Sequence, residues 1–172
     1  MKNKYFFLSL FISLNSYAQN RIIIRGLNNF QKSDLPFVSN IIKSNFDIPI
    51  YYQSSIKVNK TDRIQTNDVQ KVIKSKTSFG YDSDKDITIF VTRDKLRTED
   101  LDVAGICYGN EVYIQLKRSE KYITNTLIHE LSHSFGLKHC SNKCLMSIDK
   151  KNYEITIFCN DCRKKLPKYF KK

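Results

Sequence analysis

The chain has 172 residues and a formal net charge of +12, with 41% apolar and 27% charged residues. This length predicts a single domain with a hydrophobic core, and the composition is typical of a globular protein and not of a fibrous or disordered one. No run approaches the ~18 consecutive apolar residues of a membrane-spanning helix, so we expect no transmembrane segment in the mature chain.

The N-terminus has the order of a secretory signal. Lys2 and Lys4 precede the apolar stretch YFFLSLFISL, and Ser16 and Ala18 are small residues two positions apart, as signal peptidases require. We therefore expect residues 1–18 to be a cleaved signal peptide and the protein to be periplasmic or extracellular; a buried first helix is the alternative. Cleavage would remove two lysines and no acid, which lowers the net charge from +12 to +10.

The predicted elements after residue 18 alternate between strands and helices. In chain order they are a strand at 21–27, a helix at 33–46, a strand at 48–58, a helix at 66–78, a strand at 86–92, a polar connection at 93–102, strands at 103–109 and 111–116, a helix at 120–135 and a short helix from Asn160. The strand at 86–92 is almost wholly apolar, which predicts a central position in the sheet. The alternation favours an α/β or α+β layer structure, in one domain over residues 19–172.

Basic residues are spread along the chain and are densest in the tail RKKLPKYFKK. No aromatic or groove-reading pattern accompanies them, so we expect no nucleic-acid partner. A solvated basic surface is the simpler interpretation, with weak attraction for acidic substrates or anionic envelope material.

All the histidines of the chain, His129, His133 and His139, lie within eleven positions. His129 and His133 are four residues apart on a predicted helix, so their imidazoles lie on one face and can bind one Zn²⁺. Gly136 is expected to end that helix and to turn the chain back, which brings His139 to the same metal. Three histidine ligands leave one position for water, as in catalytic zinc sites. Glu130 stands beside the metal, where a carboxylate can take a proton from a zinc-bound water.

A lone histidine is more often a packed or surface residue, and a bare HExxH can arise by chance. The stretch HELSHSFGLKH fits the longer pattern HExxHxxGxxH, which is far more specific. Met146 follows seven residues after His139, and cysteine pairs follow in HCSNKCLM and CNDC. In these motifs the chain resembles the archaemetzincins (archaelysins), a family of metzincin zinc metallopeptidases with an additional four-cysteine zinc site. The resemblance covers roughly residues 86–165 in pattern and residues 129–162 in motifs.

The resemblance implies a metzincin-like zincin fold, with a mixed twisted sheet, an active-site helix and a small C-terminal subdomain stabilised by zinc. It implies that Glu130 is the general base and that Met146 forms the tight turn beneath the metal. The implied ligands of the catalytic zinc are His129, His133 and His139, and those of a structural zinc are Cys140, Cys144, Cys159 and Cys162. Three residues separate Cys140 from Cys144 and twelve separate Met146 from Cys159; both spacings are shorter than in the family pattern.

Disulfides are the alternative for these four cysteines, because export would place them in an oxidising compartment. Closely spaced cysteine pairs are nevertheless typical of zinc sites, so we predict one catalytic and one structural Zn²⁺. Cys107 lies in a predicted strand and is expected to be a buried thiol and not a nucleophile.

The predicted function is a monomeric zinc metallopeptidase, either an endopeptidase or an aminopeptidase, that hydrolyses peptides or proteins through a zinc-bound water activated by Glu130. By resemblance, the strand at 103–109 would be the sheet edge that pairs with an extended substrate. Two alternatives remain, namely a zinc-stabilised binding protein without proteolytic activity and a hydrolase of a non-peptide amide.

Overall fold

The computed structural model describes residues 21–58, 63–75, 86–99, 101–147, 157–166 and 170. The expected signal peptide and residues 76–78 of the second predicted helix lie outside the described residues. Within the described ranges, no helix is both long enough and apolar enough to cross a membrane.

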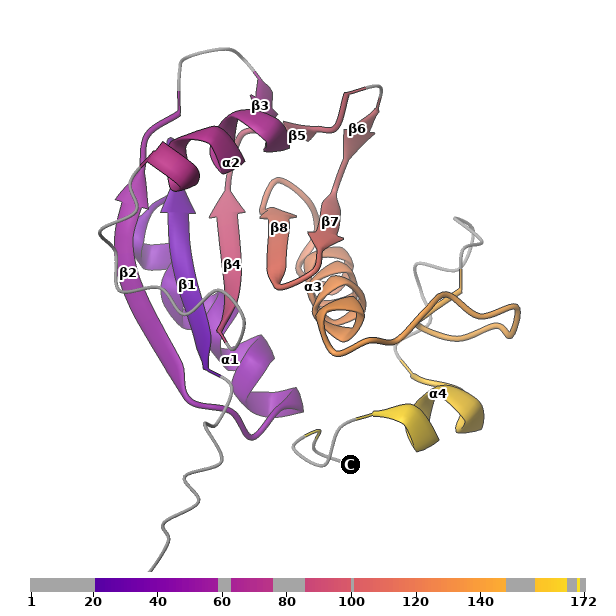
Figure 1. Ribbon diagram of the computed structural model, residues 1–172. Helices are drawn as coiled ribbons and strands as arrows, with labels where there is room; N and C mark the ends of the chain where they lie inside the picture. Colours follow the sequence, from indigo (N-terminus) through magenta and orange to yellow (C-terminus); the bar gives the residue numbers. More distant parts are fainter. Residues whose placement is uncertain are drawn as a thin grey trace, which may run out of the picture.

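A five-stranded mixed sheet forms the centre of the molecule (Figure 1). Its strand order is β2-β1-β4-β8-β7, with β7 antiparallel to β8 and the other neighbours parallel. The strands are β1 (Ile22–Leu27), β2 (Ile50–Ile56), β4 (Ile87–Thr92), β7 (Gly105–Tyr108) and β8 (Glu111–Gln115). Every residue of β4 is buried and β4 is the middle strand, which confirms its predicted central position.

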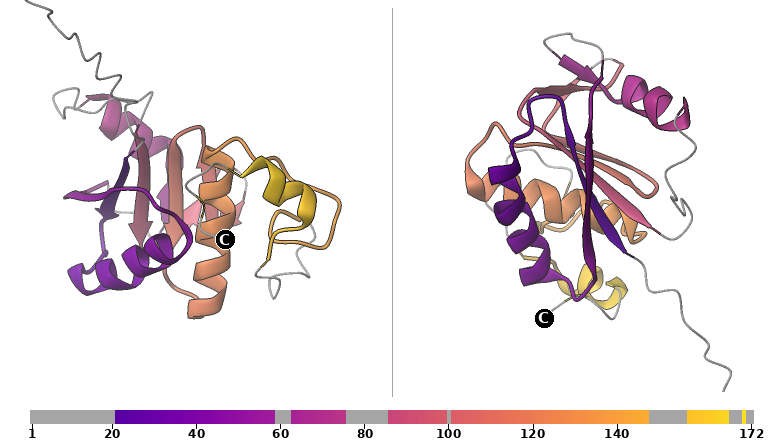
Figure 2. Two further views of the ribbon diagram at one scale, coloured as in Figure 1. Left: turned by 90° about the horizontal axis from the view of Figure 1, so that it is seen from below. Right: turned by 90° about the vertical axis from the view of Figure 1, so that its left-hand side faces the viewer.

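Two layers of helices cover this sheet (Figure 2). The helices α1 (Leu35–Asn45) and α3 (Glu120–Ser134) pack on one face, and α2 (Thr66–Ser75) packs on the other. Because side chains alternate along a strand, Ile89 of β4 joins the core under α1 and α3, whereas Phe90 joins the core under α2. The three helices predicted at 33–46, 66–78 and 120–135 are thus confirmed, within the residues that the structure describes.

A second, three-stranded sheet corrects two predictions. It consists of β3 (Arg63–Gln65), β5 (Lys95–Arg97) and β6 (Asp102–Val103). The segment 93–102 was predicted as a polar connection, but it contains β5, because Leu96 is fully buried and the backbone pairs with β3. The predicted strand 103–109 is divided between β6 and β7. In β5 a single apolar residue, Leu96, stands between two basic residues, which gives no alternating pattern. The sequence alone therefore does not predict a strand there.

The histidine-bearing helix ends as predicted. Ser134 is the last residue of α3, Phe135 follows as its cap, and Gly136 has φ +87°, the left-handed conformation that favours glycine. A loop over residues 137–147 follows, and α4 (Asn160–Lys165) begins at the predicted residue. The loop and α4 lie together beyond the end of α3, away from α2 (Figure 1).

Candidate metal centre

The three histidines converge on one point. Their Nε2 atoms lie 3.1 Å apart for His129 and His133, 3.2 Å for His129 and His139, and 3.1 Å for His133 and His139. The helix α3 places the first two one turn apart, and the turn at Gly136 returns His139 toward them. Three nitrogens bound tetrahedrally to one Zn²⁺ at about 2.0–2.1 Å would lie roughly 3.3–3.4 Å apart. The cluster therefore fits a single zinc ion.

Backbone carbonyls fix the orientation of two of the rings. The Nδ1 of His129 lies 2.7 Å from the carbonyl oxygen of Leu145, and the Nδ1 of His133 lies 2.7 Å from that of Leu137. A carbonyl only accepts, so each Nδ1 carries the proton and each Nε2 presents a lone pair. The lone pairs of the Nε2 atoms of His129 and His133, which lie 3.1 Å apart, repel each other. A cation bound between them would offset this repulsion.

Burial keeps these imidazoles neutral. Desolvation lowers the pKa of His129 to about 4 and also lowers the pKa of His133, against the opposing effect of the two carbonyls. Neutral imidazole is the form that binds a metal. His129 and His133 are therefore ready to bind zinc at neutral pH without first losing a proton.

Glu130 is a residue of α3, and its side chain lies against the edge strand β7. Desolvation raises the pKa of its carboxyl to about 7. Gly105 of β7 packs against the same part of the helix: a Cβ at this position would lie 2.6 Å from Cγ2 of Thr126 and 3.0 Å from Cγ of Glu130. The absence of a side chain at Gly105 thus makes room for Glu130.

Met146 belongs to the turn beside the histidines. It is completely buried in the core that α3 shares with the sheet. Its carbonyl accepts the N–H of Cys140 at 3.0 Å, and the neighbouring Leu145 supplies the carbonyl that orients His129. This turn therefore links the histidine cluster to the cysteines.

The four predicted cysteine ligands also come together, in spite of their short spacing. The Sγ of Cys144 lies 3.1 Å from that of Cys140 and 3.9 Å from that of Cys162, and one ligand atom from each of the four residues, Cys159 included, lies within 4.8 Å of the others. Disulfide bonds are about 2.05 Å long, so these are free thiols. Sulfurs bound tetrahedrally at about 2.3 Å to zinc would lie roughly 3.8 Å apart, so this set fits one ion.

The start of α4 favours a thiolate at Cys159. The backbone N–H of Cys162 donates to the sulfur of Cys159 and, together with the side chain of Asn142, lowers its pKa to about 6. Burial has the opposite effect on Cys162 and raises its pKa. A thiolate that forms readily at the rim of the cluster provides a first ligand for an incoming metal ion.

Cys107 stays outside both clusters. It lies on β7, and its Sγ donates to the carbonyl of Gly109 at 3.3 Å. Burial, reinforced by the negative charge of Glu130, raises the pKa of Cys107 to about 12. The thiol is therefore protonated at neutral pH, which agrees with the expectation that it is not a nucleophile.

Sequence reasoning missed three participants of this centre. They are Gly105 and the carbonyls of Leu137 and Leu145. A main-chain carbonyl has no sequence signature, and the role of Gly105 depends on how closely β7 approaches α3. The glycine inside the predicted strand was the one usable signal, since such a glycine often marks a close approach.

The sequence of this chain is similar to those of known peptidases. The sequence model of peptidase family M54 matches residues 21–168. The archaemetzincin of Thermococcus kodakarensis is 30% identical over 94 residues, which are 50% of this chain and 50% of that protein. The chain thus matches only about half the length of that relative.

Two solved structures share the fold. The crystal structure of archaemetzincin from Archaeoglobus fulgidus has a TM-score of 0.66 at 16% identity, and covers 84% of this chain and 99% of that one. The archaemetzincin of Methanopyrus kandleri has a TM-score of 0.65 at 15% identity, and covers 88% and 95%. The fold expected from the histidine and cysteine motifs is therefore confirmed.

Proposed function

The chain belongs to peptidase family M54, and we propose that it is a zinc metallopeptidase in which Glu130 is the general base. The observation that supports this most strongly is the convergence of three Nε2 atoms within 3.1–3.2 Å of one another, on the helix that also carries Glu130. Zinc bound there would polarise the scissile carbonyl and lower the pKa of water.

Glu130 has the properties that this task requires. Its pKa of about 7 lies near the pH at which a base must both accept and release protons. Glu130 would take a proton from the attacking water and later pass it to the leaving amine. His129 and His133 would hold the metal through Nε2, with the carbonyls of Leu145 and Leu137 preventing rotation of their rings.

The edge strand β7 provides a place for an extended peptide. It is the last strand in the sheet order, so within the described residues only β8 pairs with it. An extended substrate could add to this edge through main-chain hydrogen bonds. That arrangement favours peptides over small amides as substrates, and either endopeptidase or aminopeptidase cleavage is compatible with it.

The cysteine cluster supports a second, structural zinc. Four sulfurs, from the loop after α3 and from Cys159 and Cys162 at the start of α4, would be cross-linked by one ion, which would stabilise this C-terminal region. We further propose that residues 1–18 direct export to the periplasm or the exterior, and that the mature protein acts as a monomer.

A peptide-library experiment tests the proposed activity. The zinc-loaded protein is incubated with a mixture of peptides, and mass spectrometry identifies the cleaved bonds. Cleavage that a chelator abolishes and added zinc restores is the expected result, and the positions of the cuts distinguish an endopeptidase from an aminopeptidase. A zinc-loaded protein that cleaves no peptide but hydrolyses other amides would contradict the proposal.

A further inference from the structure

We propose that a basic pocket at the carboxyl ends of β4 and β8 binds a phosphate-type oxyanion. The pocket has a volume of about 270 Å³ and is lined by Arg63, Arg93, Asp94, Lys95 and Lys117. None of these residues belongs to the histidine or cysteine clusters, so this would be a site separate from the proposed peptidase centre.

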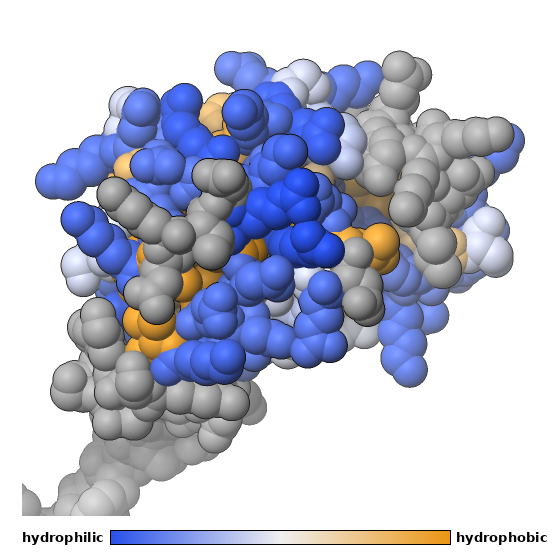
Figure 3. Space-filling view, turned by 90° about the horizontal axis from the view of Figure 1, so that it is seen from above, coloured by the Kyte–Doolittle hydropathy of each residue, from blue (hydrophilic) through white to orange (hydrophobic). Residues whose placement is uncertain are grey.

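The fold brings two of the cations together where parallel strands end. Thr92 of β4 and Gln115 of β8 are partners in the parallel register, and the N–H of Leu116 donates to the carbonyl of Thr92 at 2.7 Å. Arg93 directly follows β4 and Lys117 follows β8 by two residues. In open α/β sheets, ligands bind outside the carboxyl ends of the strands. Figure 3 looks down on this end and shows strongly hydrophilic side chains across it.

The other two cations are cross-strand neighbours. Arg63 and Lys95 are direct partners in the parallel pairing of β3 with β5, so their side chains leave the sheet on the same face. Like charges in this arrangement repel each other and destabilise the pair of strands. A bound anion would convert that repulsion into attraction.

The neighbouring acids leave an excess of positive charge. Arg63 forms an ion pair with Asp102 at 3.7 Å, and both side chains are more than two-fifths exposed. Asp94 accepts a hydrogen bond from Asn29 at 2.6 Å. Among the described residues, no acid pairs with Lys95 or Lys117.

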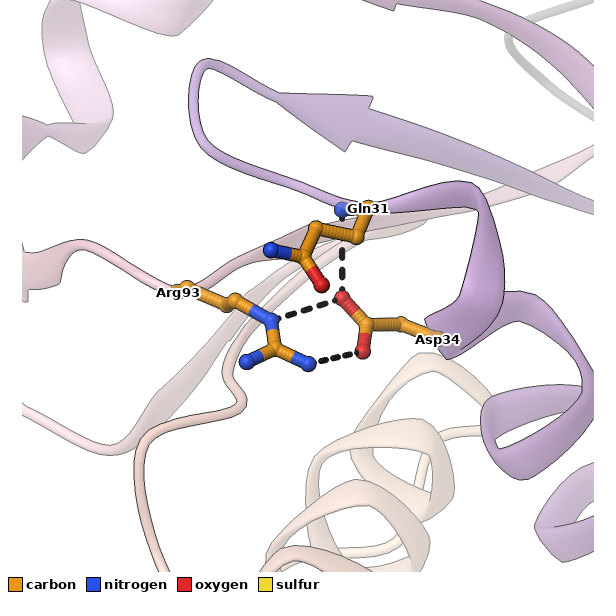
Figure 4. A network of polar contacts seen from close by, with 3 residues as sticks. All are labelled: Gln31, Asp34 and Arg93. Atoms are coloured by element: carbon orange, nitrogen blue, oxygen red, sulfur yellow. Dashed lines mark hydrogen bonds and ion pairs between the residues drawn. The ribbon is translucent and has the colours of Figure 1, made fainter.

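Arg93 is held in place for such a ligand. Asp34 is buried, with 8% of the residue exposed, and its carboxylate accepts hydrogen bonds from Nε of Arg93 at 3.0 Å and from one terminal nitrogen at 2.5 Å. The other terminal nitrogen points away from Asp34 (Figure 4). Because the guanidinium is fixed in advance, little entropy is lost when that nitrogen donates to an anion.

The chemistry favours a doubly charged oxyanion. Phosphate presents several acceptor oxygens around one centre, so it suits a planar guanidinium and the two exposed ammonium groups of Lys95 and Lys117 better than a monovalent halide would. Inorganic phosphate and a phosphate monoester share these oxygens, and the volume of the pocket leaves room for the organic part of an ester.

Isothermal titration calorimetry of the zinc-loaded full chain tests the proposal. Inorganic phosphate and a small phosphate monoester are titrated separately, at an ionic strength held constant with chloride. Lys95→Gln and Lys117→Gln should each weaken phosphate binding about tenfold, the loss expected for one charge-assisted hydrogen bond. Lys121→Gln is the control, since Lys121 is exposed on α3 outside the pocket, and it should bind as the wild type does. Tighter binding of the monoester would identify an ester as the ligand.

Thermal unfolding gives an independent readout. Without phosphate, Lys95→Gln should unfold at the same or a higher temperature than the wild type, because a repulsion is removed. With phosphate, the wild type should gain more in melting temperature than this variant does. Wild-type protein that binds phosphate no better than chloride would overturn the proposal. So would phosphate binding that survives both lysine changes and disappears when zinc is removed, since the anion would then bind at the metal.

Discussion

Gly105 on the edge strand packs so closely against Glu130 on α3 that a Cβ at position 105 would lie 3.0 Å from Cγ of Glu130. The same Cβ would lie 2.6 Å from Cγ2 of Thr126, one turn earlier on the helix. A side chain at 105 would thus press on the helix face that carries the proposed base, and also on Cδ1 of Ile114 on β8, which would lie 3.0 Å away.

Gly105→Ala should lower kcat far more than it lowers zinc content. A displacement of a catalytic group by about 1 Å can cost as much as ~100-fold in rate, and we expect a loss of at least tenfold. Steady-state kinetics with zinc analysis measure both quantities. Thr126→Ser removes the closer methyl, so adding it to Gly105→Ala should restore part of the rate, while Thr126→Ser alone should have little effect. A double variant no more active than Gly105→Ala would show that steric displacement is not the cause.

Asp34→Asn should destabilise the fold at neutral pH. Asp34 accepts hydrogen bonds from Arg93 and from the N–H of Gln31 at 3.1 Å, and these tie the start of α1 to the end of β4 (Figure 4). Loss of a charge-assisted bond of this kind costs about 2 kcal/mol of unfolding free energy. Denaturant unfolding at pH 7 measures it, with Asp47→Asn, at an exposed position, as a control expected to change little.

The same pair predicts a pH dependence of stability. The hydrogen bond from Arg93 is the largest cause of the lowered pKa of Asp34, whose ordinary value is 3.8. A lowered folded pKa means that the stabilisation is complete above the unfolded value and is lost as the pH falls through the folded value. The stability difference between wild type and Asp34→Asn should therefore persist down to about pH 4 and shrink below it. A difference that stays constant to pH 2 would contradict this assignment.

Met146→Leu should be tolerated, whereas Met146→Ala should not. Met146 is fully buried, and a swap that conserves volume usually costs less than about 1.5 kcal/mol, whereas truncation to alanine costs roughly 2–5 kcal/mol. Chemical denaturation of both variants separates the two cases. If Met146→Leu lost the catalytic zinc completely, Met146 would be a ligand and not a packing residue.

Replacing Cys159 and Cys162 with Ser should lower the zinc content from two ions per chain to one. The remaining ion would be bound by the histidines, and the region around α4 should become more susceptible to proteolysis, because the cross-link is lost. Elemental analysis and thiol titration under denaturing conditions measure the outcome. One zinc in the wild type, with Cys107 as the only titrating thiol, would instead establish two disulfides.

The sequence predicts those parts of the centre that depend on local geometry. Two histidines one helical turn apart and a left-handed glycine are encoded within a few residues, and the structure places His129, His133 and Gly136 accordingly. The central position of β4 is likewise visible in its uninterrupted apolar run.

The parts of the fold and of the site that the sequence does not predict depend on contacts between segments far apart in the chain. The carbonyl of Leu145 reaches His129 only because the loop after α3 folds back, and β5 exists only because β3 is available to pair with it. The bond between Asp34 and Arg93 joins residues 59 positions apart. No periodicity reveals such pairings, since each partner alone has the pattern of an ordinary surface residue.

Glu130 is proposed to be a base beside a zinc ion and not a ligand of it. The most direct measurement compares wild type and Glu130→Gln for zinc content and for turnover of one cleaved peptide in the same preparation. The change is isosteric and removes the proton acceptor, so the variant should retain the histidine-bound zinc and lose at least ~100-fold in kcat. Near-wild-type turnover in Glu130→Gln would show that Glu130 is not the base, and a loss of zinc in step with the loss of activity would show that Glu130 is a ligand.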